Sequence, residues 1–256
     1  MLKNAITQIQ KKKGDEKIAM ITCYDYSFAK ILDGLVDLIL VGDSLGHVLL
    51  GHSSTAHVTM QDILRHVEAV RRGAPNTFII GDLPAGSYES PESAIENAQQ
   101  IMKAGADAIK PEGKPEIIQI LTDKKIPVMA HLGYLPQTAE KFVVVGRKEE
   151  EAANLLQQAL LVQQAGAFAV VLECIPAQLA KNISQKLDIP TIGIGSGVDC
   201  DGQVLVLYDL LGLYTDFKPK FVRKYLDLAD LVNKAVKNYV KDIKSLSFPA
   251  KNEEYE

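Results

Sequence analysis

A short apolar run followed by a segment of helical character recurs about eight times along this chain. This repetition limits the possible folds more than any other feature. The run at 38–41 has four apolar residues without alternation, which is typical of a strand buried on both faces. Strands that alternate with helices indicate a parallel sheet. The eight predicted strands are 18–21, 38–41, 78–80, 108–109, 127–130, 169–172, 191–193 and 204–207.

Eight such units favour a closed (β/α)8 barrel over an open doubly wound sheet. Similar phrases at 103–107 (KAGAD) and 164–167 (QAGA) each end a helix and lead into the next strand, as internal repeats do. The length of 256 residues matches a single barrel, and no linker-like segment interrupts it. We therefore predict one barrel domain over 1–256, with an extra N-terminal helix at 1–13 and further C-terminal helix at 220–244.

Composition and charge exclude several classes of partner. The net charge is −4, and its acidic and basic residues are interspersed, so we expect neither nucleic acid nor a membrane as a partner. The polar, Lys-rich segment 1–17 lacks the apolar core of a signal peptide, and we expect a cytoplasmic protein. The cysteines, Cys23, Cys174 and Cys200, are odd in number and form no CxxC pair, which predicts reduced thiols.

Polar side chains follow several of the predicted strands. In a barrel the carboxyl ends of all strands meet on one face, whatever their separation in sequence. The residues in question are Asp43, Ser44, Asp82, Lys110, Glu112, His131, Glu173 and Ser196. Four are carboxylic acids, and like charges brought together raise the free energy unless a cation or a proton offsets them. Because Lys110 alone does not balance four acids, this set predicts a bound divalent cation.

The spacing of two acids indicates which cation to expect. Asp43 and Asp82 each follow an apolar strand with one Gly between. Two carboxylates with room for waters and substrate oxygens suit Mg²⁺, which takes about six oxygens at about 2.0–2.1 Å. The chain has no His or Cys cluster of the kind that binds zinc. The alternative for either aspartate is a helix N-cap.

Each remaining candidate has a functional and a purely structural interpretation. Glu173 leaves an apolar strand, which suits a general base, or it forms a salt bridge to Lys110 or Lys181. Lys110 either holds a substrate carboxylate or forms an ion pair with Glu112 inside the barrel. His131 either donates to a substrate oxygen or is an ordinary hydrogen-bonded barrel histidine.

The glycine-rich run GIGSG at 193–197 follows the seventh predicted strand. A dinucleotide-binding motif would open the first helix of a βαβ unit, so the match is poor. A phosphate-binding loop and a plain turn close to the site are the alternatives. Gly195 and Ser196 are accordingly candidate pocket-lining residues. The spacing is wrong for a Gly-x-Ser-x-Gly elbow, so we do not expect a serine nucleophile.

Nine short blocks carry a resemblance to one enzyme family. They are ITCYDYSFAK at 21–30, VGDSLG at 41–46, AVRRGA at 69–74, GDLP at 81–84, KPEG at 110–113, HLG at 131–133, LECIP at 172–176, IGIG at 192–195 and DGQV at 201–204. In this order they resemble the ketopantoate hydroxymethyltransferase family, from about residue 18 to residue 225. Segment 138–147 departs from the family pattern, because it is shorter and lacks a Gly pair.

The resemblance implies a fold and a reaction. The fold is a (β/α)8 TIM barrel of the phosphoenolpyruvate/pyruvate-like superfamily. The reaction moves a hydroxymethyl group from 5,10-methylenetetrahydrofolate to 3-methyl-2-oxobutanoate, giving 2-dehydropantoate and tetrahydrofolate in the first step of pantothenate biosynthesis. The resemblance also implies one Mg²⁺ per subunit and a homo-oligomer, a decamer of pentamer rings.

The family's functional residues can be placed on matching positions of this sequence. Asp43 and Asp82 would be the Mg²⁺ ligands, with Glu112 beside the metal through a water. The keto acid would contact Asp43, Ser44, Asp82, Lys110 and His131. Glu173 would remove the C3 proton to form an enolate that Mg²⁺ stabilises.

Two other functions compete with this interpretation. One is a different Mg²⁺-dependent carbon–carbon lyase or mutase on the same barrel superfamily, which would not need folate. The other is a ligand-binding barrel without catalysis, which would bind a keto acid but exchange no C3 proton.

Overall fold

The computed structural model describes residues 2–216 and 219–255. The chain divides into two compact units, Met1–Val206 and Leu207–Glu256. All eight strands belong to the first unit. Each unit is described separately below.

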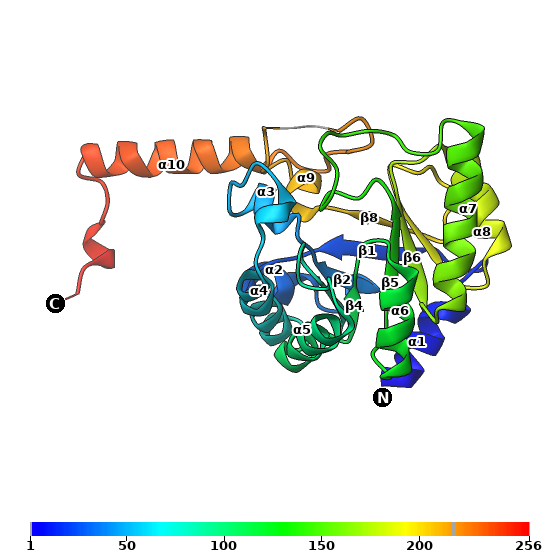
Figure 1. Ribbon diagram of the computed structural model, residues 1–256. Coiled ribbons are helices and arrows are strands. Elements are labelled where there is room, and N and C mark those ends of the chain that lie inside the picture. Colours follow the sequence, from blue (N-terminus) through cyan, green and yellow to red (C-terminus); the bar gives the residue numbers. More distant parts are fainter. Residues whose placement is uncertain (1, 217–218, 256) are drawn as a thin grey trace. The chain divides into compact units, whose positions relative to one another are not determined.

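A parallel barrel forms the centre of the first unit (Figure 1). Its strands are β1 (Ile18–Thr22), β2 (Leu38–Val41), β3 (Phe78–Asp82), β4 (Ala108–Lys110), β5 (Met129–Gly133), β6 (Ala169–Glu173), β7 (Thr191–Ile194) and β8 (Gly202–Leu205). Their order is β4-β3-β2-β1-β8-β7-β6-β5. A parallel bridge between Ile109 and Val128 joins the two ends, so the barrel is nearly closed. The predicted (β/α)8 fold is confirmed.

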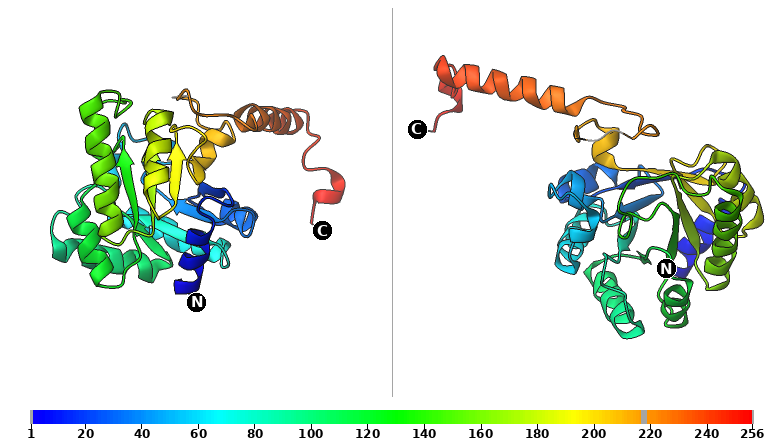
Figure 2. Two further views of the ribbon diagram at one scale, coloured as in Figure 1. Left: turned by 90° about the vertical axis from the view of Figure 1, so that its right-hand side faces the viewer. Right: turned by 45° about the horizontal axis from the view of Figure 1, so that its top comes forward.

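Helices alternate with the strands and surround them (Figure 2). They are α1 (Leu2–Lys11), α2 (Tyr26–Leu32), α3 (Leu45–Val48), the 3₁₀ turn η1 (Thr55–His57), α4 (Met60–Gly73), α5 (Pro91–Ala104), α6 (Pro115–Asp123), α7 (Glu149–Gln164) and α8 (Ala177–Lys186). Thr59 and Ser90 begin α4 and α5 as N-caps with reciprocal capping boxes. The predicted N-terminal helix corresponds to α1, and the first residue of the prediction lies outside the described residues.

The fifth and eighth strands are shifted most from their predicted positions. The eighth strand begins at Gly202, two residues earlier than expected, because Gly202 pairs with Ile18 of β1 at close range. A Cβ at position 202 would lie 2.5 Å from the Ile18 carbonyl oxygen, so only glycine fits. The fifth strand begins at Met129 and extends to Gly133, so His131 lies inside the strand instead of after it.

The second unit is helical. It contains α9 (Leu207–Leu210), α10 (Leu228–Lys244) and the 3₁₀ turn η2 (Lys251–Glu253). The helix predicted over 220–244 therefore begins at Leu228. None of the described residues of α10 is buried, and its exposed apolar side chains are Leu231, Val232, Val236, Tyr239, Val240 and Ile243. Among the described residues, no helix is both long and apolar enough to cross a membrane.

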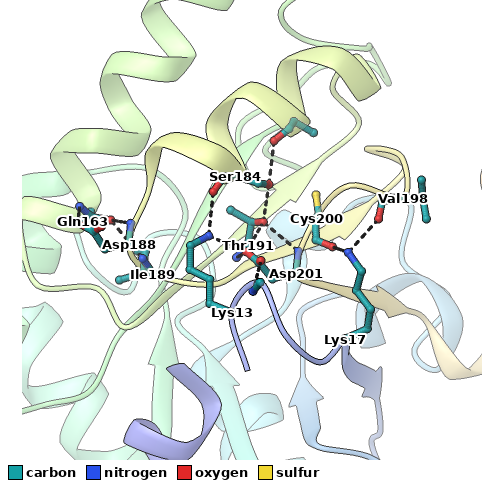
Figure 3. Close-up of polar contacts among 12 residues, drawn as sticks. Lys13, Lys17, Gln163, Ser184, Asp188, Ile189, Thr191, Val198, Cys200 and Asp201 are labelled. Carbon is teal, nitrogen blue, oxygen red and sulfur yellow. Dashed lines mark hydrogen bonds and ion pairs between the residues drawn. The ribbon is translucent and has the colours of Figure 1, made fainter. Parts of the chain in front are cut away.

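A polar network joins the N-terminal segment to the amino ends of β7 and β8 (Figure 3). Lys13 Nζ donates to the Ser184 carbonyl oxygen at 2.8 Å and to Asp201 Oδ2 at 2.9 Å. Asp201 also accepts from the Thr191 amide at 2.9 Å. A cavity of about 630 Å³ lies beside this network and includes Lys13, Lys17 and Asp201 in its lining. The amino end of a barrel usually serves stability, and this network fits that role.

Candidate active site

The carboxyl ends of the strands bring six charged or titratable side chains together, as the sequence predicts. We call this group the strand-end cluster: Asp43, Asp82, Lys110, Glu112, His131 and Glu173. Strand register places two pairs opposite each other, Asp82 with Lys110 and Gly133 with Glu173. All members except Glu173 are buried.

Lys110 is the buried cation of the cluster, and its ion-pair partner is Asp82. Lys110 Nζ lies 3.0 Å from Asp82 Oδ1. The other oxygen, Asp82 Oδ2, accepts a hydrogen bond from the Asp43 backbone amide at 3.0 Å. The anticipated pair between Lys110 and Glu112 is therefore not the contact that forms. Asp82 instead connects the ends of β2, β3 and β4.

The four acids of the cluster outnumber its two basic residues, Lys110 and His131. Burial raises the pKa of Asp43 to about 8, with the nearby charges of Asp82 and Glu112 adding to the effect. Burial also raises the pKa of Asp82, although Lys110 opposes the shift. Glu112 Oε1 is buried, and its polar contact is the ion pair with His131 Nδ1 at 3.3 Å. Buried acids gathered in this way could share a cation.

An oxygen-rich donor set of this kind fits a hard divalent cation better than a soft metal. Within the described residues, no group of three or more His, Cys, Asp or Glu side chains is arranged to hold a metal. Asp43 and Asp82 could hold such a cation, with water or substrate oxygens completing the coordination. Mg²⁺ commonly binds in this way, through one or two carboxylates.

His131 lies between two carboxylates. Its Nδ1 is 3.3 Å from Glu112 Oε1, and its Nε2 is 3.1 Å from Glu173 Oε2. Burial and the charge of Lys110 lower the pKa of His131, but its contacts with Glu112 and Glu173 outweigh them and raise the pKa to about 9. The raised pKa favours the imidazolium form of His131. The ion pair that Glu173 forms is with His131, whereas Lys181 lies 3.5 Å from Asp199.

Glu173 is more accessible than the other acids that form ion pairs in the cluster. Its side chain keeps 16% of its surface exposed, against 1% for Asp82 and 2% for Glu112. A carboxylate at the edge of a buried, charged site can reach a substrate and still be held by a neighbouring cation. This position fits proton transfer.

The backbone behind Glu173 is tightly fixed. The Glu173 carbonyl oxygen accepts from the Tyr134 amide at 2.8 Å, and Gly133 lies so close to this oxygen that a side chain there would collide with it. Cys174, the next residue, has a φ of +51°, which is unusual for a residue with a side chain. Together these contacts orient the end of β6.

The glycine-rich loop at 193–197 contributes the Ser196 hydroxyl group to this end of the barrel. Ser196 is fully buried, and its Oγ donates to the Leu172 carbonyl oxygen at 2.7 Å. The same hydroxyl oxygen accepts from the Ile175 amide at 3.4 Å. Gly195, the residue before it, has a φ of +66°. Ser196 thus connects the end of β7 to the backbone on both sides of Glu173.

Three residues of the site were not predicted from the sequence: Tyr24, Tyr88 and Gln137. Tyr24 lies with its hydroxyl 2.8 Å from Ser44 Oγ, the candidate substrate contact after β2. Tyr88 and Gln137 are buried and hydrogen bonded to each other. Each lies in a loop after a strand. Polar residues are common in such loops, so their position in the sequence did not identify them as site residues.

The loop that departs from the family pattern is anchored at its far end. The Val145 amide donates to the Cys174 carbonyl oxygen at 3.0 Å, and the Gly146 amide donates to Glu151 at 3.2 Å. Near its start, the rings of Tyr134 and Phe142 meet edge to face with centroids 5.3 Å apart. The shorter loop is therefore connected to the backbone that follows Glu173.

Comparison with known proteins gives consistent results for sequence and fold. The family model described as ketopantoate hydroxymethyltransferase matches residues 3–251. A 3-methyl-2-oxobutanoate hydroxymethyltransferase of Francisella tularensis is 48% identical over 98% of this chain and 98% of that protein. The Chlorobaculum tepidum protein of the same name is 49% identical over 96% of this chain and 94% of its own.

Solved structures with the same fold are far more distant in sequence. A putative phosphonomutase from Burkholderia cenocepacia has a TM-score of 0.69 and 14% identity, covering 91% of this chain and 99% of its own. A phosphonopyruvate hydrolase solved with oxalate and Mg²⁺ has a TM-score of 0.63 and 12% identity, covering 97% of this chain and 93% of its own. A 2,3-dimethylmalate lyase, described as a PEP mutase/isocitrate lyase superfamily member, has a TM-score of 0.62 and 16% identity, covering 98% of this chain and 92% of its own. These likenesses establish the barrel fold.

Proposed function

The chain belongs to the ketopantoate hydroxymethyltransferase family, and we propose that the strand-end cluster is where its reaction takes place. It is accordingly an enzyme that transfers a hydroxymethyl group to 3-methyl-2-oxobutanoate, a step toward pantothenate. The observation that carries the proposal is the pairing of Glu173 with His131, 3.1 Å apart, beside three buried acids.

In this proposal Asp43 and Asp82 would hold one Mg²⁺ ion, with Glu112 beside it through a water. The raised pKa values of both aspartates support this assignment, because burial disfavours their charges and a bound cation would offset that cost. When bound, the ion would polarise the 2-oxo group of the keto acid as a Lewis acid. The hydrolase of the same fold that was solved with oxalate and Mg²⁺ is consistent with this choice of metal.

The keto acid carboxylate would bind near Lys110 and His131, both cationic and buried. Burial disfavours the charge on Lys110, but Asp82, Asp43 and Glu112 outweigh it and raise the pKa of Lys110 above its usual value. Ser44, held by the Tyr24 hydroxyl, would donate to a substrate oxygen. Fixed donors in a site that excludes water stabilise negative charge that develops on the substrate.

Glu173 would act as the base. Its carboxylate takes the proton from C3 of the keto acid, so a C–H bond breaks, an O–H bond forms on Glu173, and the electron pair moves toward the 2-oxo oxygen. We propose 5,10-methylenetetrahydrofolate as the one-carbon donor: it takes up one water, both C–N bonds of its methylene carbon break, and tetrahydrofolate leaves. The carbon nucleophile forms a C–C bond to the released one-carbon unit, whose oxygen comes from that water and gains the proton held by Glu173. His131, 3.1 Å from Glu173, holds the carboxylate in place until the substrate arrives.

The first half of this reaction can be observed alone, by following exchange of the C3 proton of 3-methyl-2-oxobutanoate in D₂O by NMR. We expect exchange with enzyme and Mg²⁺, and none after chelation. Glu173→Gln should lower the exchange rate by about 10²–10⁴-fold, the usual contribution of a general base. Because the amide preserves the size of the side chain, calorimetric titration should show keto acid binding retained. Undiminished exchange in this variant would contradict the role of Glu173.

The need for folate separates this proposal from the alternative, another lyase or mutase of the same barrel superfamily. Product formation that requires 5,10-methylenetetrahydrofolate supports the proposal. Cleavage or isomerisation of a substrate without folate would support the alternative, which the solved structures favour by fold only.

We also propose that the protein works as a homo-oligomer in the cytoplasm. The exposed apolar side chains of α10 offer a surface that assembly would cover. Light scattering during size-exclusion chromatography should give a mass that is a multiple of the 28.0 kDa chain. Elution at the mass of one chain would refute the oligomer.

A further inference from the structure

Gln137, in the segment after β5, connects two members of the strand-end cluster. Its Nε2 donates to Asp43 Oδ2 at 2.8 Å and to the Leu83 carbonyl oxygen at 2.9 Å. Its backbone amide donates to Glu112 Oε2 at 3.1 Å. The residue is buried, with 7% of its surface exposed. One residue therefore engages one oxygen of Asp43 and one of Glu112.

Tyr88 determines which end of the Gln137 amide faces Asp43. The Tyr88 hydroxyl donates to Gln137 Oε1 at 2.6 Å and accepts from the Glu112 amide at 3.3 Å. Since the hydroxyl proton goes to Oε1, the NH₂ end must point toward Asp43 and Leu83. The amide cannot rotate without placing two acceptors, Oε1 and an Asp43 oxygen, against each other. Its orientation is thus fixed by three contacts.

We propose that Gln137 is a positioning residue for the metal site: its amide holds Asp43 by Oδ2 and turns this carboxylate toward Asp82. The inference rests on the proposed roles of Asp43 and Asp82 as Mg²⁺ ligands. An amide is suited to this task because it donates a hydrogen bond without adding charge to a site that already contains several acids. A lysine would neutralise Asp43 and compete with the cation, and a glutamate would repel it.

The contacts of Gln137 divide between its backbone and its side chain. The contact with Glu112 is made by the backbone, so it persists when the side chain is replaced. Gln137→Met keeps the length of the side chain and removes both donors. Gln119→Met is the matched control, because the Gln119 amide also donates to an aspartate, Asp123, at 2.9 Å, but on the exposed surface of α6.

The experiment titrates the metal-free full-length protein with MgCl₂ by isothermal calorimetry. Loss of a partner that orients a ligand typically costs about 10–100-fold in metal affinity. We expect a weakening of this size in Gln137→Met and no change in Gln119→Met. Tyr88→Phe, which frees the amide to rotate, should weaken Mg²⁺ binding by a smaller factor and provides a second variant if Gln137→Met does not fold.

A second measurement separates positioning from general damage to the site. The rate of C3 proton exchange is followed as a function of Mg²⁺ concentration. We expect Gln137→Met to need about 10–100-fold more Mg²⁺ but to approach the wild-type rate at saturation, because Glu173 is untouched. A lower rate at saturating Mg²⁺ with unchanged Mg²⁺ affinity would overturn the inference, and so would unchanged values of both.

The two proposals fail in different ways. A wild-type protein that binds Mg²⁺ but exchanges no C3 proton would contradict the proposed function and leave the calorimetric comparison of Gln137→Met valid. A wild-type protein that binds no Mg²⁺ in the calorimeter would overturn the positioning role itself.

Discussion

Lys110 shows how one residue balances the strand-end cluster. It is 3% exposed and lies among Asp82, Asp43 and Glu112. Removing one partner of a buried ion pair typically costs about 3–5 kcal/mol, because a charge is left without compensation. We therefore expect Lys110→Met to lower the free energy of unfolding of the metal-free protein by this amount, measured by urea unfolding with chelator present.

The same variant tests whether a cation can replace the lost charge. With the ammonium gone, added Mg²⁺ should bind more tightly and stabilise Lys110→Met more than the wild type, since only the folded state holds the site. Thermal melts followed by circular dichroism, with and without MgCl₂, measure both increments. Lys103→Met, which changes an exposed lysine of α5, is the control. Equal increments in all three proteins would argue against a cation site at the cluster.

The residues of the strand-end cluster could be predicted from the sequence, but their contacts could not. The residues of the cluster were predictable because each lies at or near the carboxyl end of a strand, and parallel strands bring their carboxyl ends together. Which residues of the cluster pair with each other was not predictable. Lys110 forms its ion pair with Asp82 and not with Glu112, and this depends on the strand register. Gln137 and Tyr88 were missed because their contacts depend on how two loops fold over the barrel end.

At the scale of elements, three helix ends can be compared. Gly105 ends α5 and Gly166 ends α7, both with positive φ. At the end of α6 the same place is taken by Lys125, with a φ of +64°. Its amide donates to the Thr122 carbonyl oxygen, and the Ile126 amide donates to that of Leu121, the pattern of a Schellman motif.

A left-handed conformation costs a residue with a side chain about 1–2 kcal/mol. Replacing Lys125 with glycine removes that cost but adds back about 0.4–1 kcal/mol of chain entropy in the unfolded state. We expect Lys125→Gly to stabilise the protein by about 0.5–1 kcal/mol, or roughly 1–4 °C in Tm, measured by thermal unfolding.

Gly166→Lys is the reciprocal variant. It should destabilise the protein, because a Cβ there would approach Thr122 Oγ1 to 3.0 Å in addition to the backbone strain. If Lys125→Gly lowered the Tm, the lysine side chain would have to contribute more to stability than its left-handed backbone costs. That outcome would rule out backbone strain as the dominant effect at this helix end.

Local patterns predicted most elements but not all their boundaries. The repeated Ala-Gly-Ala phrases marked helix ends that the structure confirms. The start of α10 was placed too early because the apolar spacing continues through 222–226. In the structure the Tyr225 amide donates to the carbonyl oxygen of Leu210, the last residue of α9. The Leu228 amide donates to that of Leu211. Because of these contacts within the second unit, the helix begins only at Leu228.

At the scale of the whole barrel unit, the two ends have different tasks. The carboxyl end concentrates charge in a way that costs stability, as functional sites commonly do. The amino end contains the network around Asp201, in which every partner identified for this carboxylate is a donor. Lys13 and Asp201 are 188 residues apart in sequence, so their contact joins the start of the chain to its last strand.

This contact makes a pH-dependent contribution to stability. Burial alone would raise the pKa of Asp201, but hydrogen bonds from Thr191 and Lys13 outweigh it and lower the pKa below its usual value. A carboxyl group whose pKa is lower in the folded state stabilises that state at all pH values above its unfolded pKa of about 3.9. The stabilisation is lost as pH falls from there through the folded-state pKa.

A double-mutant cycle of Lys13→Met and Asp201→Asn measures this contribution. The chain contains no Trp, so urea unfolding is best followed by circular dichroism, between pH 7 and pH 3. Hydrogen bonds to charged groups contribute about 1.5–3 kcal/mol, and we expect a coupling free energy near the lower end, because the Lys13 side chain is 18% exposed. The coupling should be constant from pH 7 to about pH 5 and then decline below about pH 3.9 as Asp201 gains a proton. A coupling that stayed constant down to pH 3 would mean that packing of the N-terminal segment, and not the charge on Asp201, holds this end of the barrel together.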